Sequence, residues 1–375
     1  MSWNSPATPS HSHSLLHEQP RWHIALTVNL KGETSWDDDA PPDAGAEYDS
    51  PKTVEAIAAA LASDGHRVTI CRADRTLPYR LAELQPDICF NIAEGAGDDS
   101  REAHVPALCA LLGIPYTASG VLANALALDK SQTKRVWRSF NLPTPRFQEF
   151  GTGSEPISRA LRYPLFVKPA REGTGMGIGD NSIVYNARQL RKRIGYVLRT
   201  YQQPALVEEY MPGREFTVGY LGNRGRGLNR RNPEFYDSRG YHLFPVMEID
   251  TSAISTEGVY GLEAKAIDAR DPEAPGYLCP ADIPVALVEH LYELTIRAAE
   301  AIGALDVARV DFRLDAVGVP HLLEINTLPG LNQTQSDLCM MATAEGVTYQ
   351  TLLTEILYLA AERYGLLKPA VTVLA

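Results

Sequence analysis

The sequence is poor in cysteine and has no excess of positive charge. Five cysteines, an odd number, are scattered along 375 residues without a CxxC pair. That pattern argues against a disulfide framework and against zinc ligation, so we expect reduced and mostly buried thiols. The formal net charge is −11. Because nucleic-acid binding relies on clustered lysine and arginine, the sequence predicts no nucleic-acid partner.

Long apolar runs are also missing from the sequence. No segment approaches the ~18 consecutive apolar residues that a membrane-spanning helix needs, so we expect no membrane partner. Residues 1–20 are rich in Ser, Pro and His and lack the apolar stretch of a secretory signal. We expect a disordered tail there; a metal site on His11, His13 and His17 is the weaker alternative, because a flexible tail fixes no ligand geometry. These features predict a cytoplasmic protein.

The composition that is present is that of a folded globular protein. Charged residues make up 22% and hydrophobic residues 45% of the chain, and its length suffices for two or three domains. In residues 21–125, apolar strand patterns alternate with helical ones, which predicts a small parallel α/β domain. Within it, Ser50 and Pro51 offer the N-cap and first position of an Ala-rich helix that Gly65 closes.

The remainder divides into two further predicted units. Residues 126–217 contain a strand at 163–170, a glycine-rich loop, a helix near 187–201 and a strand broken by Pro-Gly. This pattern predicts a compact α+β module. Residues 218–375 contain the strand HLFPVMEID, a long amphipathic helix, a hairpin and a C-terminal helix near 347–364. We expect them to form the third domain.

The hairpin RVDFRLDAVGVPHLLEINTLPG, residues 309–330, gathers polar groups on one face. Side chains alternate along a strand, so pairing Asp311 with Glu324 also pairs Arg309 with Asn326. The turn then falls at residues 316–319. Arg313 joins the polar face, while Leu323 and Ile325 are expected on the opposite, apolar face.

The two opposed carboxylates of this face need a neutralising charge, because directly opposed like charges destabilise a sheet. A hard divalent cation would supply it, since Asp, Glu and Asn offer only oxygen ligands, which suit Mg²⁺ or Mn²⁺. The alternative is a solvated hairpin face on which Arg309 and Arg313 neutralise the acids. The hairpin by itself does not decide between these two interpretations.

Two upstream features favour a nucleotide site. Lys168 ends the strand LFVK and is followed by a loop with four glycines, whose backbone N–H groups could cover phosphates. The loop fits neither the P-loop nor the Rossmann pattern, and alone it is more often a mobile surface loop. Glu208, Glu209 and Glu215 flank a Pro-Gly break and could accept hydrogen bonds from adenine or ribose, or else be exposed surface acids.

Together these segments resemble the ATP-grasp superfamily, specifically D-alanine–D-alanine ligases and their relatives. The likeness extends from about Arg21 to the C-terminus and is densest in GIPYTASGVLANALALDKSQTK, FVKPAREGTGMGIG, EEYMPGREFTV, EAK and RVDFRLD…LLEINTLPGL. Several motifs in the same order argue against a chance match. The resemblance implies an ATP-grasp fold of mixed α/β and α+β class, with three domains and ATP between the central and C-terminal ones.

The resemblance also implies roles for individual residues. Nucleotide contacts fall on Lys130, Lys168 and Lys265 at the phosphates, Thr174, Gly175, Met176 and Gly177 in the lid, Glu208, Glu209 and Met211 at adenine, and Glu215 at ribose. Two Mg²⁺ (or Mn²⁺) ions fall on Asp311, Glu324 and Asn326. The catalytic set is Arg309, the backbone N–H of Gly330, and Lys265.

The implied chemistry has two steps. A substrate carboxylate attacks the γ-phosphate of ATP to give an acylphosphate, and an amine then displaces phosphate to form an amide. Arg309 and Gly330 would stabilise the oxyanion of the tetrahedral intermediate. Because phosphate is the leaving group, no protein nucleophile is required. Relatives are commonly homodimers, so a homodimer is one assembly that the resemblance suggests, although the sequence itself does not give the oligomeric state.

The sequence departs from the family where substrates would bind. Its first loop is longer and acidic, so Glu47 and Glu94 are the best matches for first-substrate contacts. The family's Lys-Tyr pair becomes Lys265-Ala266, and its lid serine becomes Thr174. After Gly330 the second-substrate carboxylate contact falls to Gln335 or Ser336.

These departures predict a ligase for amino acids or a short peptide other than two D-alanines. D-alanine–D-alanine ligation itself is the close alternative. A hydroxyl acceptor, which would give an ester, and a nucleotide-binding regulator without turnover remain as further alternatives. The metal triad and Arg309 argue against the regulator.

Overall fold

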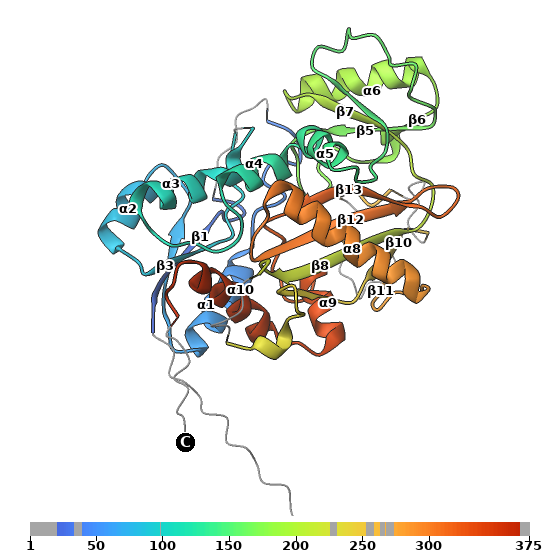
Figure 1. Cartoon of the computed structure of the whole chain (residues 1–375). Helices are drawn as coiled ribbons and strands as arrows, with labels where there is room; N and C mark the ends of the chain where they lie inside the picture. The colour runs from blue at the N-terminus through green and yellow to red at the C-terminus, as the bar shows by residue number, and fades with distance from the viewer. Residues whose placement is uncertain are drawn as a thin grey trace, which may run out of the picture.

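The computed structural model describes residues 21–33, 40–97, 99–225, 231–252, 259–262, 267 and 274–367. The expected tail at residues 1–20 and its three histidines lie outside this part of the chain. Figure 1 shows three sheets with their helices, one from the N-terminal part and two from the rest of the chain. Most of the predicted site residues lie where these units meet.

The N-terminal unit is built on a small parallel sheet. Its order is β2-β1-β3, and both pairings are parallel, as the alternation of patterns predicts. Ser50 caps the first helix by accepting from the N–H of Thr53, with Pro51 at the first helical position. The elements are β1 (His23–Val28), α1 (Pro51–Ser63), β2 (Arg67–Arg72), α2 (Leu77–Leu84), β3 (Ile88–Asn91), the 3₁₀ turn η1 (Arg101–Ala103) and α3 (His104–Leu112).

The central unit is a four-stranded antiparallel sheet of order β4-β7-β5-β6, which helix α6 covers. The glycine-rich loop connects β5 to β6. Its elements are β4 (Phe147–Phe150), β5 (Leu165–Pro169), the turn η2 (Asp180–Ser182), β6 (Ile183–Val184), α6 (Ala187–Thr200) and β7 (Ala205–Glu209).

The C-terminal unit contains the largest sheet, of order β11-β10-β8-β12-β13 with β9 beside β8. The predicted strand HLFPVMEID is in fact two strands, β9 and β10, because the chain leaves the sheet around Pro245. The elements are β8 (Glu215–Gly222), the turn η3 (Pro233–Phe235), β9 (Tyr241–Leu243), β10 (Met247–Asp250), β11 (Gly276–Leu278), α8 (Val285–Ile302), β12 (Val307–Leu314), β13 (Pro320–Asn326), α9 (Asp337–Glu345) and α10 (Tyr349–Arg363).

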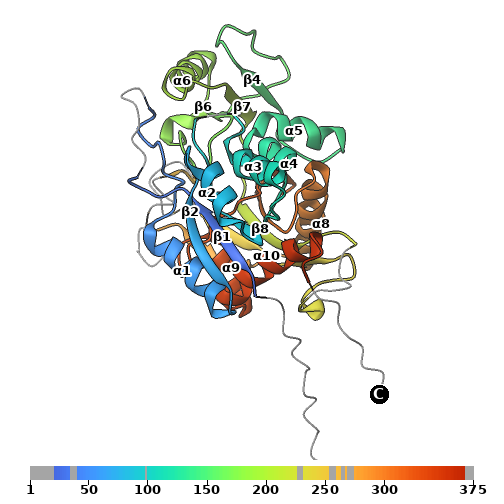
Figure 2. The same cartoon turned by 90° about the vertical axis from the view of Figure 1, so that its left-hand side faces the viewer.

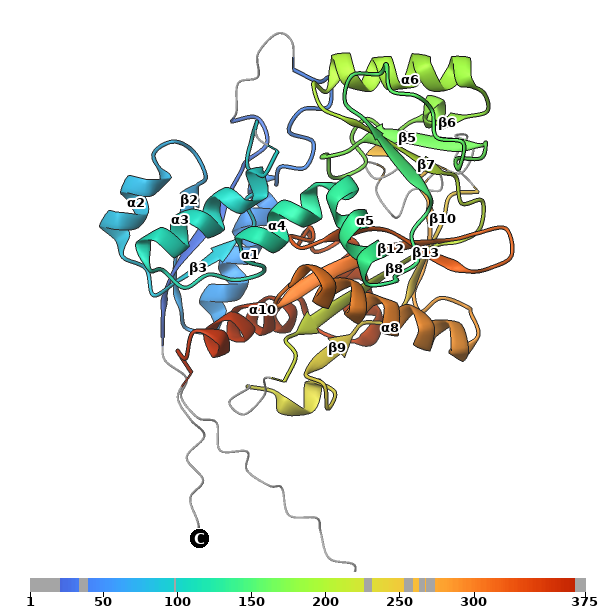
Figure 3. The same ribbon diagram turned by 45° about the horizontal axis from the view of Figure 1, so that its top comes forward.

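The N-terminal and C-terminal units share an apolar core. Helix α1 packs against α10, so one apolar cluster joins the N-terminal sheet to the C-terminal helices (Figure 2). Helices α4 (Val121–Leu128) and α5 (Lys130–Ser139) lie between the units (Figure 3). The Trp137 indole N–H of α5 donates to the carbonyl of Ala298 in α8 at 3.0 Å. The first predicted boundary, at residues 125/126, falls inside α4, and β8 runs through the second, at 217/218.

Four of the five cysteines are buried, and all five are free thiols, as expected. Among the helices that the structure describes, none combines the length and the apolar character required to cross a membrane.

Candidate active site

The polar face of the hairpin β12–β13 has the predicted register. Arg309 pairs with Asn326, and Asp311 pairs with Glu324. Asp311 is only 8% exposed, and residues of the central unit, among them Lys168 and Glu208, line the cavity over this face. The alternative of a solvated hairpin face therefore does not describe this structure.

A β-bulge follows Asp311 and corrects the prediction for its neighbours. Phe312 pairs with Leu322, so Leu323 is the extra residue of β13. Leu322 takes the buried position and Leu323 lines a cavity beside Glu324, so the expectation that Leu323 lies on the apolar face is wrong. Leu314 pairs with Pro320, so the turn spans residues 315–319 instead of 316–319.

Two cavities meet at this face, and Lys130 lines both. The small cavity, of about 70 Å³, and the large cavity, of about 240 Å³, receive nearly all the predicted site residues. The small cavity is lined by Lys168, Gly175, Met176, Glu208, Glu209, Met211, Glu215, Asp311 and Glu324. The large cavity is lined by Glu47, Glu94, Thr174, Arg309, Asn326, Gly330, Gln335 and Ser336.

Two predicted residues are not in these linings. Gly177 lies in the glycine-rich loop, away from both cavities. Lys265, like the neighbouring Ala266, lies outside the described residues, so its role stays a prediction.

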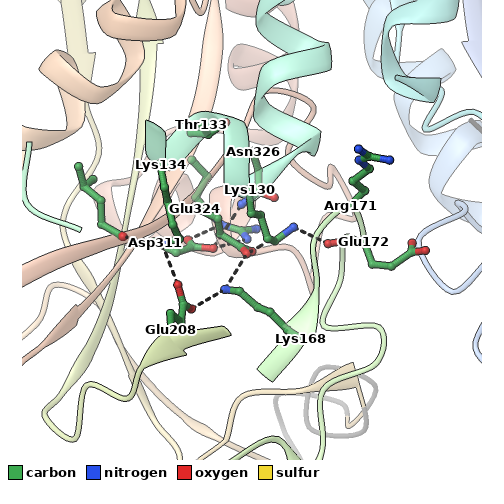
Figure 4. A network of polar contacts seen from close by, with 12 residues as sticks. Lys130, Thr133, Lys134, Lys168, Arg171, Glu172, Glu208, Asp311, Glu324 and Asn326 are labelled. Atoms are coloured by element: carbon green, nitrogen blue, oxygen red, sulfur yellow. Dashed lines mark hydrogen bonds and ion pairs between the residues drawn. The ribbon is translucent and has the colours of Figure 1, made fainter. Parts of the chain in front are cut away.

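Lysines surround the acids of the small cavity (Figure 4). Glu208 forms ion pairs with Lys168 at 3.0 Å and with Lys134 at 3.1 Å. Glu324 lies 3.6 Å from the Lys130 ammonium and 3.9 Å from that of Lys168. Although burial opposes ionisation, the two lysines lower the pKa of Glu208 below its ordinary value. The ammonium groups of Lys130 and Lys168, which line this cavity, are suited to bind phosphate oxygens.

Lys134 was missed by the sequence prediction. It lies four residues after Lys130 on α5, which places both on one helix face, and that spacing is the signal that could have revealed it. Its ammonium also donates to Thr144 and to the carbonyl of Leu322, both at 3.1 Å. Burial lowers the pKa of Lys134 to about 8 despite the opposing charge of Glu208. Its role is to hold Glu208, since it lines neither cavity.

The glycine-rich loop needs glycine at two positions. Gly175 has a φ of +76°, and a Cβ there would come within 2.8 Å of the backbone nitrogen of Leu262. Gly177 has a φ of +70°, and its Cβ would come within 2.6 Å of Pro169. Thr174, also in the left-handed region with a φ of 52°, turns into the large cavity. The loop is thus pressed against its surroundings and closes over both cavities.

An acidic segment of the N-terminal unit fastens this loop. The backbone N–H of Gly177 donates to the Asp43 carboxylate at 2.9 Å. The Tyr201 hydroxyl donates to the same oxygen at 2.8 Å. Asp43 therefore links the first domain to the loop and to the end of helix α6, a contact that no sequence pattern indicated.

Arg309 is held by two carboxylates. Its Nε and Nη2 each donate to Asp311 at 2.9 Å, and its Nη1 lies 3.1 Å from Asp337. Thr217 donates its hydroxyl to Asp311 at 2.7 Å. Burial opposes the charge, but Asp311 and Asp337 raise the pKa of Arg309 well above its ordinary value. Arg313 instead pairs with Glu215 at 3.5 Å and donates to the Tyr210 hydroxyl at 3.0 Å.

The donor set of the polar face fits a hard divalent cation. Asp311 and Glu324 are opposed across the strands, and the Asn326 amide lies 3.3 Å from Asp311. Arg309, Lys130 and Lys168 currently neutralise the two acids. Among the described residues no group of three or more His, Cys, Asp or Glu is close enough to hold an ion. Two carboxylates and an amide suit a site that nucleotide phosphates complete.

The large cavity gathers carboxylates around Arg101. Glu47 accepts from Arg101 at 3.1 and 2.8 Å, and its other oxygen is buried without a hydrogen-bond partner. Burial, opposed by Arg101, raises the pKa of Glu102 to about 7. Burial likewise raises the pKa of Glu94 well above its ordinary value, with Glu102 and Glu47 adding to the effect. This end of the cavity is suited to a cationic group.

The far end of the large cavity is the start of helix α9. Ser336 is its N-cap residue, and the Ser336 hydroxyl accepts from the N–H of Asn332 at 2.9 Å. A Cβ at Gly330 would come within 2.8 Å of that hydroxyl, so a larger residue at this position would have to displace the Ser336 side chain. Asp337, the first residue of α9, lies in the cavity and was missed by the sequence prediction.

Comparison with known proteins finds relatives of this chain. The family described as "D-ala D-ala ligase C-terminus" matches residues 136–358. An uncharacterized protein, y4sG, of Sinorhizobium fredii is 33% identical over 84% of this chain and 88% of its own length. A D-alanine–D-alanine ligase of Syntrophotalea carbinolica is 34% identical over 82% of this chain and 89% of its own.

The fold also has a counterpart among solved structures. A D-alanine–D-alanine ligase of Bacillus anthracis, complexed with ATP, superposes with a TM-score of 0.67 over 92% of this chain and 99% of that one, at 20% identity. That likeness establishes the ATP-grasp fold. The family match and the curated relatives, in turn, establish that this chain belongs to the D-alanine–D-alanine ligase family of ATP-grasp enzymes, which form carbon–nitrogen bonds.

Proposed function

We propose that the chain uses ATP to activate a substrate carboxylate as an acylphosphate and then joins it to an amine. One observation carries the proposal: Lys130 and the polar face of β12–β13 lie between a small cavity suited to a nucleotide and a large cavity suited to charged substrates. A reaction between a γ-phosphate and a carboxylate requires these two binding sites to meet.

The small cavity supports the nucleotide end of the proposal. Met176 and Met211 are buried in its lining, with exposures of 5% and 9%, and Leu323 adds an apolar surface. Glu209 and Glu215 could accept from the adenine amino group and the ribose hydroxyls. Lys130 and Lys168 would exchange their contacts with Glu324 for phosphate oxygens, and Glu324 would then bind metal.

Asp311, Glu324 and Asn326 would hold two divalent ions, Mg²⁺ or Mn²⁺, which when bound offset the negative charge of the phosphates during transfer. The chain's own residues position the reactants. Gly175 and Met176 line the small cavity, where they would cover the bound nucleotide and exclude water.

In the first step, a carboxylate oxygen of the donor attacks the γ-phosphorus, and ADP leaves. In the second, the acceptor nitrogen attacks the acylphosphate carbon, the carbon–oxygen bond to phosphate breaks, and the nitrogen loses a proton. Arg309 and the backbone N–H of Gly330 lie together in the large cavity, where they would stabilise the oxyanion between these events. Lys265 would complete the phosphate contacts.

The large cavity supports amino-acid or short-peptide substrates. The unpartnered buried oxygen of Glu47, with Glu94 nearby, would accept the ammonium group of the donor. Thr174, Gln335 and Ser336 would contact the donor and acceptor from the opposite wall. Because these residues differ from the family's usual set, we propose substrates other than two D-alanines. We place the reaction in the cytoplasm and expect a homodimer, which gel filtration would test.

D-alanine–D-alanine ligation is the second candidate. The curated relatives of Bordetella avium and Syntrophotalea carbinolica carry that name. Activity on D-alanine alone, in both positions, would decide for this candidate over the altered substrates.

The test separates activation from ligation. The full chain, with ATP and Mg²⁺, is incubated with a panel of D- and L-amino acids and dipeptides plus hydroxylamine, which traps an acylphosphate as a hydroxamate. We expect ADP release and a hydroxamate with one class of donor, and mass spectrometry identifies it. ATP binding without ADP release on any donor would contradict the proposal.

A further inference from the structure

Asp337 places a carboxylate at the acceptor end of the large cavity. The residue is 6% exposed, and its side chain lies 3.1 Å from Nη1 of Arg309. It is the first residue of α9, a helix of nine residues whose N-cap, Ser336, makes no side-chain capping bond. A helix start and an arginine both attract an anion. In this protein the carboxylate of Asp337 itself occupies that position beside Arg309.

The cations near this position are already committed. Arg309 directs Nε and Nη2 to Asp311 and Nη1 to Asp337. Lys130 donates to the carbonyl of Glu172 at 2.5 Å and lies 3.6 Å from Glu324. Among the described residues of the lining, Lys31 is the other cationic side chain, and it is exposed. An acceptor carboxylate beside Arg309 would meet Asp337 and be repelled.

We propose that Asp337 determines acceptor specificity: it fills the place of an acceptor carboxylate and selects an amine whose α-carbon bears a neutral group instead. This inference rests on the proposed ligase function and deepens it. The acceptors that share this chemistry are amino-acid amides, the N-termini of peptides and simple amines. In all of them the reacting nitrogen can approach Arg309 and Gly330 without a second negative charge beside Asp337.

The experiment compares acceptors that differ only in that charge. The donor found by hydroxylamine trapping is combined with alanine or alaninamide, in both enantiomers, and with glycine or glycinamide. The kcat/KM of each acceptor is expressed per unprotonated amine. The wild-type enzyme should favour the amide of each pair. A dipeptide and ethylamine then distinguish peptide N-termini from simple amines.

The variants test the assigned residue. Asp337→Asn should lower the amide-to-acid ratio at least about tenfold, equivalent to about 1.4 kcal/mol. Asp337→Glu, which keeps the negative charge, should keep the wild-type preference for the amide. Glu345→Gln, at the exposed far end of the same helix, is the control and should leave the ratio unchanged. If Asp337 had only a structural role, Asp337→Asn would lower kcat/KM for the amide and for the acid acceptor equally. Hydroxamate formation measures the activation step separately.

Two results would overturn the inference. One is a wild-type enzyme that prefers the amino acid to its amide, which needs no variant and so does not depend on whether Asp337→Asn folds. The other is an unchanged ratio in Asp337→Asn. Absence of hydroxamate with every donor would instead contradict the proposed function.

Discussion

The small and the large cavity meet at Lys130 but differ in how their charges are balanced. In the small cavity the Glu208 carboxylate is paired with Lys134 and Lys168, which hold its pKa below the ordinary value although burial opposes this. In the large cavity burial instead raises the pKa values of Glu94 and Glu102. Acids paired with lysines suit a site for a phosphate ligand that displaces them, whereas buried acids with raised pKa values suit a substrate that brings a positive charge.

This difference follows the family resemblance. Residues that would contact ATP match the family's motifs, while those that would contact substrates depart from them. The family's motifs therefore describe the small cavity, where ATP would bind, well. The large cavity, where the chain's own substrates would bind, must be understood from its own contacts.

The largest effect is expected at the boundary of the two cavities. Glu324→Gln keeps the shape of the side chain but removes a charge that lies beside two lysines and that the proposed metal ions would need. Turnover should fall at least about 1,000-fold with the fold retained, as ADP release and circular dichroism would show. Glu83→Gln, on an exposed position of α2, is the control. Normal turnover in Glu324→Gln would refute the metal assignment.

A change confined to the small cavity should affect ATP alone. Lys168→Met removes a buried ammonium from Glu208 and from the expected phosphate site. We expect kcat/KM for ATP to fall about 100-fold, close to 3 kcal/mol, with a much smaller change in the KM for the donor. Lys192→Met, an exposed lysine of α6, is the matched control. Equal losses for ATP and donor would contradict the separation of the cavities.

The link between the N-terminal unit and the glycine-rich loop should have a moderate effect. Asp43→Ala removes the acceptor for Gly177 and Tyr201. Loss of these hydrogen bonds, about 1–2 kcal/mol, should raise the KM for ATP up to about tenfold and speed hydrogen exchange in residues 175–178. Glu55→Ala, an exposed acid of the same unit, is the control. Unaltered exchange would show that the loop closes without Asp43.

The last effect is on the stability of the fold, and it depends on pH. Burial raises the pKa of Glu102 from 4.5 to about 7, although Arg101 opposes the shift. The folded chain then binds this proton more tightly than the unfolded chain, so stability falls as pH rises through this range. Glu102→Gln should therefore stabilise the chain by about 1–3 kcal/mol at pH 8 and by less at pH 5 in urea unfolding. Equal effects at both pH values would contradict the raised pKa.

Local pattern predicted the parts of this structure that depend on neighbouring residues. Alternation along residues 309–326 was sufficient to place Asp311 opposite Glu324, because the side-chain period of a strand is two. It could not locate the bulge, because Leu322 and Leu323 are both apolar and either could face the core. The Pro-Gly break and the helix cap at Ser50 were readable for the same local reason.

Contacts between distant segments could not be predicted in this way. Asp43 and Gly177 are 134 residues apart, and Glu47 and Arg101 are 54 apart. No spacing rule relates such positions, because only the tertiary fold brings them together. Asp337 was missed because an acid in the first turn of a helix is common for reasons unrelated to substrate.

The central claim is that the donor carboxylate attacks the γ-phosphate of ATP at the junction of the two cavities. Its most direct test is a single-turnover reaction with a donor labelled with ¹⁸O in its carboxylate, followed by mass spectrometry of the released phosphate. An acylphosphate route predicts one ¹⁸O atom in inorganic phosphate and none in the nucleotide. Label in AMP, or unlabelled phosphate, would contradict the account.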